Sequence, residues 1–412
     1  MTKISKKFQI IRKFYIPGYW PLETFVLLLI CIFFSSCPDN DADLPVMYIH
    51  FNEELNGEVK KPCTIDYFPE DGKKIVLPAK IKRRGGFSYG FPKHSYSLKL
   101  DSDFSFAGMN ADDNWYLISS YIDKTLMRHK ISYDLFRSMG NNNIAPHCTY
   151  VILYVNNDYH GIYQLTERLD KNRLGVSKSD TSGMIFKEPM IFFEGIYTDY
   201  NDSLNYYHQR YPEKNISDRA RVIDSFKDFM FNSPDSVFSH KEKGIIQWLD
   251  IDNIIDWHLL VLFTNNADGI KKGFYFYKKD SDAPFRMALW DYDHCFGRDG
   301  DNEMNMNERP VDCTKIILFK RLLDLNPYNY KDRLKERWAQ LKKDDILSEN
   351  NFLKMVEENY RFIKPHVKMN FERWSYDSYI YFDDNNFETE VNIMKEFIKI
   401  RIPYIDKYIK EL

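Results

Sequence analysis

Three carboxylates, Asp268, Asp291 and Asp293, lie within the stretch 265–297 and suit metal or phosphate chemistry. Asp268 follows an apolar run of helical length, and two strand-like runs separate it from the other two. Successive side chains of a strand alternate between its faces, so Asp291 and Asp293 should point the same way, and a hairpin would return them towards Asp268. Clustered carboxylates are costly unless a cation or a substrate neutralises them. Oxygen ligands suit Mg²⁺, Mn²⁺ or Ca²⁺ rather than zinc, so the stretch predicts a hard-cation site, although each Asp alone also fits a plain turn.

The elements around this stretch predict an α+β protein of two lobes, with strands first and helices later. Alternation and β-branched or aromatic runs predict strands over 46–51, 59–68, 75–84, 96–100, 115–121, 149–155, 161–168, 183–188, 273–279 and 285–290. Helical spacing predicts helices over 123–139 (N-capped by Asp123), 219–231, 251–265, 315–325, 331–341, 350–362 and 391–410. Segments 197–210 and 300–312 are expected to be loops. The strand-rich lobe then covers about 47–190 and the helical lobe about 215–412.

A glycine-rich turn, 85–90, joins two of the predicted strands, with Arg84 before it and Lys93 just after it. Glycines let backbone N–H groups approach an anion closely, and Arg or Lys side chains supply charge. The turn has neither the spacing of a dinucleotide fingerprint nor that of a Walker loop. An ordinary hairpin turn therefore stands beside the phosphate-binding interpretation.

The N-terminus has the pattern of an export signal. A basic segment precedes the apolar run 25–34, and Ser35 and Ser36 come just before Cys37. This arrangement resembles a bacterial lipobox, and the acidic residues after Cys37 resemble the surface-export signals of Bacteroidota lipoproteins. We expect a lipoprotein signal peptide over 1–37, lipidation of Cys37 and a tether over 38–46. The expected location is the cell envelope, lipid-anchored to the outer membrane and exposed at the surface; an uncleaved N-terminal anchor is the alternative.

Composition limits the other classes of function. Hydrophobic residues make up 44% of the chain and aromatic residues 16%, which is typical of a globular protein. The net charge is −3 and the expected mature part has no long basic run, so no nucleic-acid partner is expected. The four cysteines after Cys37 are far apart and do not have zinc-site spacing, so they are either disulfide-bonded or free.

Four collinear blocks between residues 83 and 297 resemble the spore coat protein H (CotH) kinase family. They read RRGGFSYGFPKHSYSLKL, YIDKTLMRHKISYDLF, LYVNNDYHGIYQLTERLD and MALWDYDHCFG. The resemblance implies an atypical protein-kinase-like, two-lobed fold over 47–412 that uses ATP with Mg²⁺ or Mn²⁺. Some members of the family phosphorylate Ser in proteins, so a protein substrate in the cell envelope is implied.

The resemblance also implies roles for the carboxylates. Asp268 would be the catalytic-loop residue that orients the acceptor hydroxyl or accepts its proton. Asp291 and Asp293 would hold the metal against the phosphates, and which of them is the main ligand is left open.

Four further residues are implied to bind the nucleotide. Lys93, or in second place Lys99, would pair with phosphate, beside Arg84 at the glycine turn. Lys187 is a weaker candidate for the same role. Glu167 would be a charge partner or lie near the adenine, with a strand-end salt bridge as the alternative.

One position departs from the family pattern. The family commonly has Lys-Asn followed by Phe or Tyr after the loop Asp, and Gly273 stands here where that Asn would be. A metal ligand is then missing, so a pseudokinase without transfer activity stands beside the active kinase as an interpretation. The alternative function is a non-catalytic surface lipoprotein that binds protein or glycan through the Tyr-rich segments 197–211 and 374–381.

Lipidation is tested at Cys37. In Cys37→Ala, the export machinery loses its acylation site, so an uncleaved or soluble product is expected. Detergent partitioning and intact-mass measurement of the cell fractions check this. A mature form with unchanged membrane association would contradict the lipobox interpretation.

Overall fold

The computed structural model describes residues 43–177, 182–193, 206–213, 216–298, 310–375 and 385–412. The expected signal peptide, Cys37 and most of the tether lie outside these ranges. So do most residues of the segments 197–210, 300–312 and 374–381. Within the described ranges, no helix combines the length and the apolar character that crossing a membrane requires.

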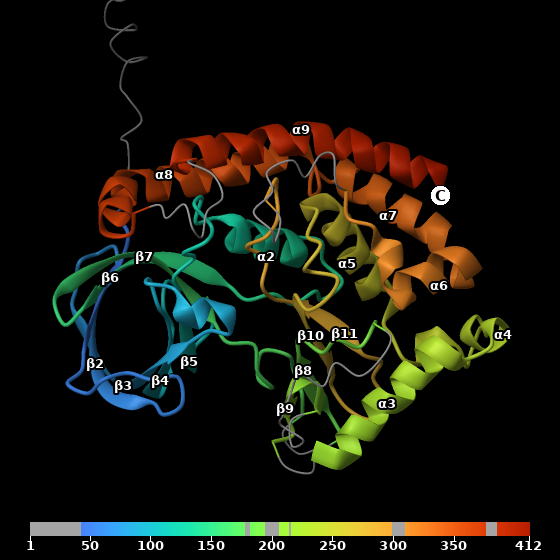
Figure 1. Cartoon of the computed structure of the whole chain (residues 1–412), viewed down its shortest axis with the longest axis horizontal. Coiled ribbons are helices and arrows are strands. Elements are labelled where there is room, and N and C mark those ends of the chain that lie inside the picture. Colours follow the sequence, from blue (N-terminus) through green and yellow to red (C-terminus); the bar gives the residue numbers. More distant parts are fainter. Residues whose placement is uncertain (1–42, 178–181, 194–205, 214–215, 299–309, 376–384) are drawn as a thin grey trace, which may run out of the picture. The chain divides into compact units, whose positions relative to one another are not determined.

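Seven strands of the described chain close into a barrel (Figure 1). In spatial order they are β1 (Val46–His50), β2 (Lys61–Phe68), β3 (Ile75–Arg84), β4 (Ser95–Phe104), β5 (Asp112–Ile118), β7 (Asp158–Glu167) and β6 (Cys148–Val155). The parallel pairing of β1 with β6 completes the ring, and the other neighbours are antiparallel. Alternate side chains such as Ile65, Ile81 and Leu98 fill the interior, so the barrel is a packed core.

A smaller sheet carries the stretch that holds the three carboxylates. Its order is β11 (Arg286–Leu289), β10 (Phe274–Lys278), β8 (Met184–Lys187) and β9 (Gln209–Tyr211). The predicted hairpin is confirmed, because β10 and β11 pair antiparallel with Phe274 opposite Leu289. Asp291 and Asp293 therefore emerge from the same end of this hairpin at which β10 begins.

The rest of the described chain is mainly helical. The helices are α2 (Arg128–Ser138), α3 (Ile216–Asn232), α4 (Asp235–Phe238), α5 (Ile251–Thr264), α6 (Ile317–Leu325), α7 (Tyr330–Lys343), α8 (Glu349–Arg373) and α9 (Phe387–Glu411). Every residue of α5 except Asp252 is buried, and α2, α7 and α9 pack around this helix (Figure 1). Asn265, in the left-handed conformation, ends α5 just before Asp268. The predicted α+β order, strand-rich first and helical later, is confirmed.

The start of α2 differs from the prediction. The helix begins at Arg128 rather than after Asp123, because Leu126 has a φ of +61° that a right-handed helix does not allow. Asp123 still bonds the helix start, since its carboxylate accepts from the backbone N–H of Thr125 and of Arg128. Asp123 therefore accepts from an N–H five residues further along the chain, whereas a standard N-cap accepts from the N–H two or three residues on.

Four charged side chains form a buried cluster that joins three distant segments. Arg128 Nη1 lies 2.6 Å from Asp123 Oδ1 and Arg128 Nη2 lies 2.9 Å from Glu390 Oε2 on α9. Arg298 Nη1 lies 3.2 Å from Glu390 Oε1, and Arg128 Nε donates to the carbonyl of Cys295. All four side chains are completely buried. Burial alone would raise the pKa of Asp123, but the Arg128 charge and the bonds from Thr125 and Arg128 lower it below its usual range.

Lys93 lies at a junction between the barrel and α8. Its buried Nζ donates to the carbonyl of Ile162 at 2.6 Å and to Asn370 Oδ1 at 3.1 Å. Asn370 Oδ1 also accepts from the Ile162 N–H, so the same amide bonds the strand and the lysine. Burial lowers the pKa of Lys93 to about 7. The lysine thus connects the segment after the glycine turn to β7 and α8.

The buried cluster predicts a large loss of stability in Glu390→Gln. This change leaves Arg128 and Arg298 buried with less opposing charge, and breaking a buried pair typically costs about 3–5 kcal/mol. Urea unfolding at neutral pH measures the free energy. Glu372→Gln on α8 is the control, because Glu372 and its partner Lys368 are mostly exposed and such pairs contribute about 0–1 kcal/mol. Equal losses in both variants would contradict the role of the cluster.

The position of Lys93 predicts a pH-dependent contribution to stability. Its folded-state pKa of about 7 is below the unfolded value of 10.5, so the unfolded chain binds the extra proton between these two pH values. The free energy of unfolding of the wild type, relative to Lys93→Met, should therefore rise with pH across this window, by at most about 1.4 kcal/mol per pH unit. Urea unfolding over that pH range checks this, with the exposed Lys368→Met as control. A flat difference would contradict the burial of an amine with this pKa.

Candidate active site

A pocket lies between the end of β3, the segment after β5, the first turns of α2 and the segment after β11. Its wall includes the glycine turn at Gly85 and Gly86, both predicted carboxylates Asp291 and Asp293, and one histidine, His129. Lys187 at the end of β8 also lines the pocket, which thus combines backbone, acidic and basic groups from five separate segments.

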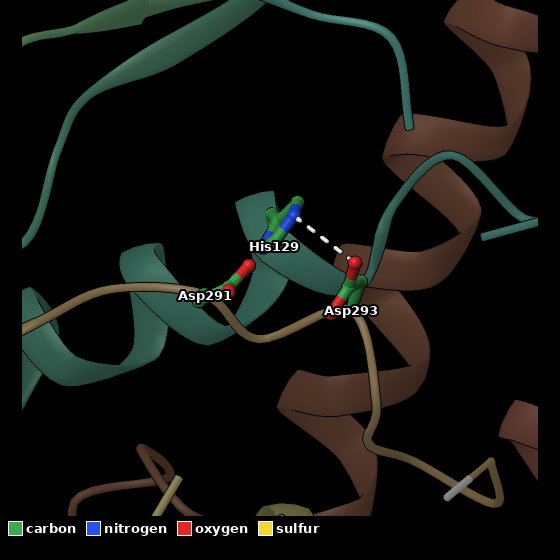
Figure 2. A group of neighbouring side chains, drawn as sticks. All are labelled: His129, Asp291 and Asp293. Atoms are coloured by element: carbon green, nitrogen blue, oxygen red, sulfur yellow. Dashed lines mark ion pairs between the residues drawn. The ribbon is translucent and has the colours of Figure 1, made fainter. Parts of the chain in front are cut away.

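His129, Asp291 and Asp293 form the acidic end of this pocket (Figure 2). One possible ligand atom from each of the three lies within 4.8 Å of the other two. His129 is buried and both carboxylates are half-buried. The His129 Nε2 lies 4.0 Å from Asp293 Oδ2, and His294 Nε2 lies 3.9 Å from the other oxygen of the same carboxylate. A divalent cation would find two carboxylates within reach of one position here.

The reason that the two carboxylates approach each other differs from the prediction. Strand β11 ends at Leu289, so strand alternation does not set the directions of Asp291 and Asp293. Asp291 instead has a φ of +57°, in the left-handed region, and the chain turns there. The turn is held by the bond from Trp290 N–H to the Gly273 carbonyl. The predicted pair is correct, and a turn rather than a pleat produces it.

Asp268 lies outside the group of three. Its carboxylate pairs with Lys272 Nζ at 3.4 Å, and its backbone carbonyl accepts from the N–H groups of Lys271 and Lys272. Burial would lower the pKa of Lys272, but the charges of Asp268, Asp291 and Glu188 raise it above its ordinary value. Lys272 therefore interacts electrostatically with both Asp268 and Asp291, although these carboxylates do not share one ligand position.

Two of the predicted nucleotide-binding cations line the pocket. The Arg84 guanidinium lies 4.1 Å from the Tyr116 ring centre and 5.5 Å from that of Trp290, and Lys187 Nζ lies 4.9 Å from Trp290. Gly85 has a φ of +142°, and a Cβ there would meet the Tyr89 nitrogen at 2.7 Å, so only glycine fits. The glycine turn and two cations thus line the same pocket as the carboxylates, a combination suited to a phosphate chain bound with a metal.

The remaining predicted residues lie elsewhere. Lys93 is held by Ile162 and Asn370, and Lys99 pairs with Asp113 on the barrel. Glu167 accepts from the N–H and Nδ1 of His147 at 3.1 and 3.0 Å and pairs with Arg173 at 3.4 Å. Of the two interpretations of Glu167, these contacts match the strand-end salt bridge.

Gly273 is packed closely against its neighbours. A Cβ at this position would meet Gly269 Cα at 2.8 Å and the Trp290 carbonyl oxygen at 3.0 Å. An Asn would therefore require backbone movement. The donor set still fits a hard divalent cation, because Asp291 and Asp293 supply oxygens close together and half-exposed to solvent, which can provide further ligands.

Sequence reasoning missed His129. It directly follows the Arg of the YIDKTLMR block and lies on α2, far in sequence from both carboxylates. Only the packing of α2 beside the end of β11 brings it to them. Its place next to a motif residue was the one signal available.

The four cysteines in the described part are free and buried, so the disulfide alternative is not seen. Burial raises the pKa of Cys63, Cys148 and Cys313 to about 12, which makes their thiols poor nucleophiles and metal ligands. The candidate site therefore depends on oxygen and imidazole groups rather than on sulfur.

Comparison with known proteins gives a relative of similar length. Inner spore coat protein H of Bacillus subtilis (strain 168) is 24% identical over 393 residues, which cover 90% of this chain and 99% of that protein. Among solved structures, the golgi casein kinase is 13% identical with a TM-score of 0.26, over 89% of this chain and 80% of that one. The Shewanella oneidensis MR-1 HipA–HipB–operator DNA complex has a chain that is 12% identical with a TM-score of 0.30, over 97% and 76%.

The family comparison is decisive. The family model described as CotH kinase protein matches residues 81–405, which includes the glycine turn, α2, the hairpin with its carboxylates and almost all of α9. The resemblance predicted from four short blocks is confirmed and extends beyond them to the C-terminal helices. The chain therefore belongs to the CotH kinase protein family.

Proposed function

We propose that this protein is an atypical protein kinase that transfers the γ-phosphoryl group of ATP to Ser or Thr hydroxyls of proteins in the cell envelope. One observation carries the proposal: Arg84, Lys187 and the glycine turn line the same pocket as Asp291 and Asp293. Phosphoryl transfer requires positioned charges far more than it requires covalent chemistry from the protein.

The proposed architecture is that of a two-lobed kinase. The barrel and its glycine turn take the place of the strand-rich lobe, and the helices around α5 take the place of the helical lobe. The pocket is lined by β3 from the first part and by the segment after β11 from the second. Membership of the CotH kinase family supports this assignment.

The phosphates are bound by the basic side of the pocket. Arg84 and Lys187 offer charged N–H donors, and the backbone of Gly85 and Gly86 offers close approach. Asp291 and Asp293 would hold Mg²⁺ or Mn²⁺. When bound, the cation neutralises phosphate oxygens as charge spreads over them in the transition state.

Asp268 has the proposed role of orienting the acceptor. The acceptor oxygen forms a bond to the γ-phosphorus, the bond between that phosphorus and the bridging oxygen of ADP breaks, and the hydroxyl proton passes to the Asp268 carboxylate. Asp268 pairs with Lys272 at 3.4 Å, and the charge of Asp291 also acts on that lysine, which links the proposed acceptor residue to the proposed metal ligands. The alternative function, a non-catalytic lipoprotein that binds protein or glycan, is favoured by Gly273, whose packing excludes the expected Asn.

The proposed location is the outer surface of the cell envelope, with Cys37 as the site of lipidation. The net charge of −3 does not suit a nucleic-acid partner. A membrane-attached kinase of this type would act on neighbouring envelope proteins.

Asp291→Asn and Asp293→Asn should each reduce the stabilisation that ATP with Mg²⁺ or Mn²⁺ gives. A ligand that binds only the native state at 100 times its Kd stabilises it by about 2.7 kcal/mol, so losing a metal ligand should remove much of the shift in melting temperature. Thermal unfolding with and without ATP and metal measures this. Asp282→Asn, an exposed residue of the β10–β11 turn, is the control. Wild-type shifts in both site variants would show that these carboxylates are structural.

Asp268→Asn should leave ATP affinity near the wild-type value and strongly reduce phosphate incorporation into the protein itself and into a generic acceptor. The reason is that Asp268 lies outside the group of three that would hold the metal. Incorporation surviving in Asp268→Asn would contradict its role. If the wild type incorporates phosphate only at background level and does not bind ATP, the kinase proposal is contradicted and the non-catalytic binding protein remains.

A further inference from the structure

His129 is held firmly at the acidic end of the pocket. It is the second residue of α2, it is 6% exposed, and its ring stacks on Tyr133 with 5.7 Å between the ring centres. Its Nδ1 accepts the backbone N–H of Tyr292 at 2.9 Å. Tyr292 is the residue between Asp291 and Asp293, so this one bond holds the backbone that carries both carboxylates.

The direction of that bond decides what the other ring nitrogen can do. A backbone N–H can only donate, so His129 Nδ1 supplies a lone pair and carries no hydrogen. A neutral imidazole has one N–H, which must then lie on Nε2. His129 Nε2 faces Asp293 Oδ2 at 4.0 Å (Figure 2). A metal ligand needs a lone pair at the coordinating atom, and this nitrogen has none to offer.

The turn that His129 holds needs such a bond. Asp291 has a φ of +57°, which is uncommon for a residue other than glycine and persists only where the surroundings enforce it. Tyr292 is completely buried, and its N–H would be an unpaired buried donor without the imidazole. The Trp290 N–H bond to Gly273 holds one side of the turn, and His129 holds the other.

We propose that His129 is a positioning residue and not a ligand of the cation. Its Nδ1 holds the turn between the two carboxylates, and its Nε2–H faces the Asp293 carboxylate at 4.0 Å, where it electrostatically favours an anionic oxygen of Asp293 or of a bound phosphate. Of the group of three, the cation then receives oxygen ligands from Asp291 and Asp293 and no nitrogen from His129. This inference rests on the proposed function, because it assumes that the carboxylates bind a divalent cation.

The direct test uses Mn²⁺ alone as the probe and the full-length wild-type chain. Pulsed electron paramagnetic resonance detects the nitrogen of an imidazole that is bound directly to Mn²⁺. The expected spectrum of the bound ion lacks the coupling of a directly coordinated ¹⁴N. A directly coordinated nitrogen that disappears in His129→Asn would overturn the inference while leaving the metal site in place. Wild-type protein that binds no Mn²⁺ would overturn the metal site of the proposed function and, with it, this inference.

Two amide variants separate the roles of the two ring nitrogens. In His129→Asn, the side-chain oxygen can occupy the position of Nδ1 and accept from Tyr292, so Mn²⁺ affinity should stay near the wild-type value. In His129→Gln, the amide reaches the position of Nε2 and the acceptor for Tyr292 is lost. Loss of a supporting bond around a metal site typically weakens metal affinity about 10- to 100-fold, which is the result expected for Gln.

The opposite order, with affinity retained in Gln and lost in Asn, would show that Nε2 is the functional atom and would overturn the proposal. Circular dichroism of each variant establishes that it is folded before the affinities are compared. If a variant is not folded, the electron paramagnetic resonance spectrum of Mn²⁺ bound to the wild type tests the proposal, because that measurement needs no substitution.

Discussion

The buried ion pair between Arg128 and Glu390 is the interaction on which the site depends most. It joins α2 to α9, and Arg298 on the segment after the carboxylates shares the same Glu390. Arg128 is directly followed by His129, whose imidazole holds the backbone between Asp291 and Asp293. Removing two full charges from water is costly, so the cluster is favourable only while all its partners are in place. The geometry of the pocket and the packing of the last helix are therefore linked.

Much of the fold could be predicted because its signals are local. The β10–β11 hairpin and helix α5 follow from alternation, helical spacing and end signals that lie within each segment. Closure of the barrel could not be predicted, because the parallel pairing of β1 with β6 joins segments about a hundred residues apart in the chain. The predicted start of α2 was wrong, because the pattern of apolar residues does not indicate that Leu126 has a left-handed backbone conformation.

In the candidate site too, local sequence patterns predicted some residues, and contacts between distant segments determined the positions of others. Asp291 and Asp293 were found because they follow a strand within a family block. Lys93 was assigned to phosphate from the glycine turn beside it, but its partner Asn370 lies on a helix 277 residues away. His129 was missed because Asp291 and Asp293 are far from it in sequence. Only the packing of α2 beside the end of β11 brings it to them. Local patterns identify residues of the right chemical type, and distant packing decides which of them reach the pocket.

The parallel pairing of β1 with β6 also sets a limit on how far the N-terminus can be shortened. The Pro45 carbonyl accepts from the Ile152 N–H on β6, and Leu44 is buried in the core cluster formed mainly by the helices, so both residues are part of the packed fold. A shortened chain that begins after β1 would leave the backbone donors and acceptors of β6 and β2 unpaired at an open edge. Open edges of this kind pair with other chains, and aggregation would follow. Recombinant forms that omit residues 1–37 should therefore begin before Leu44.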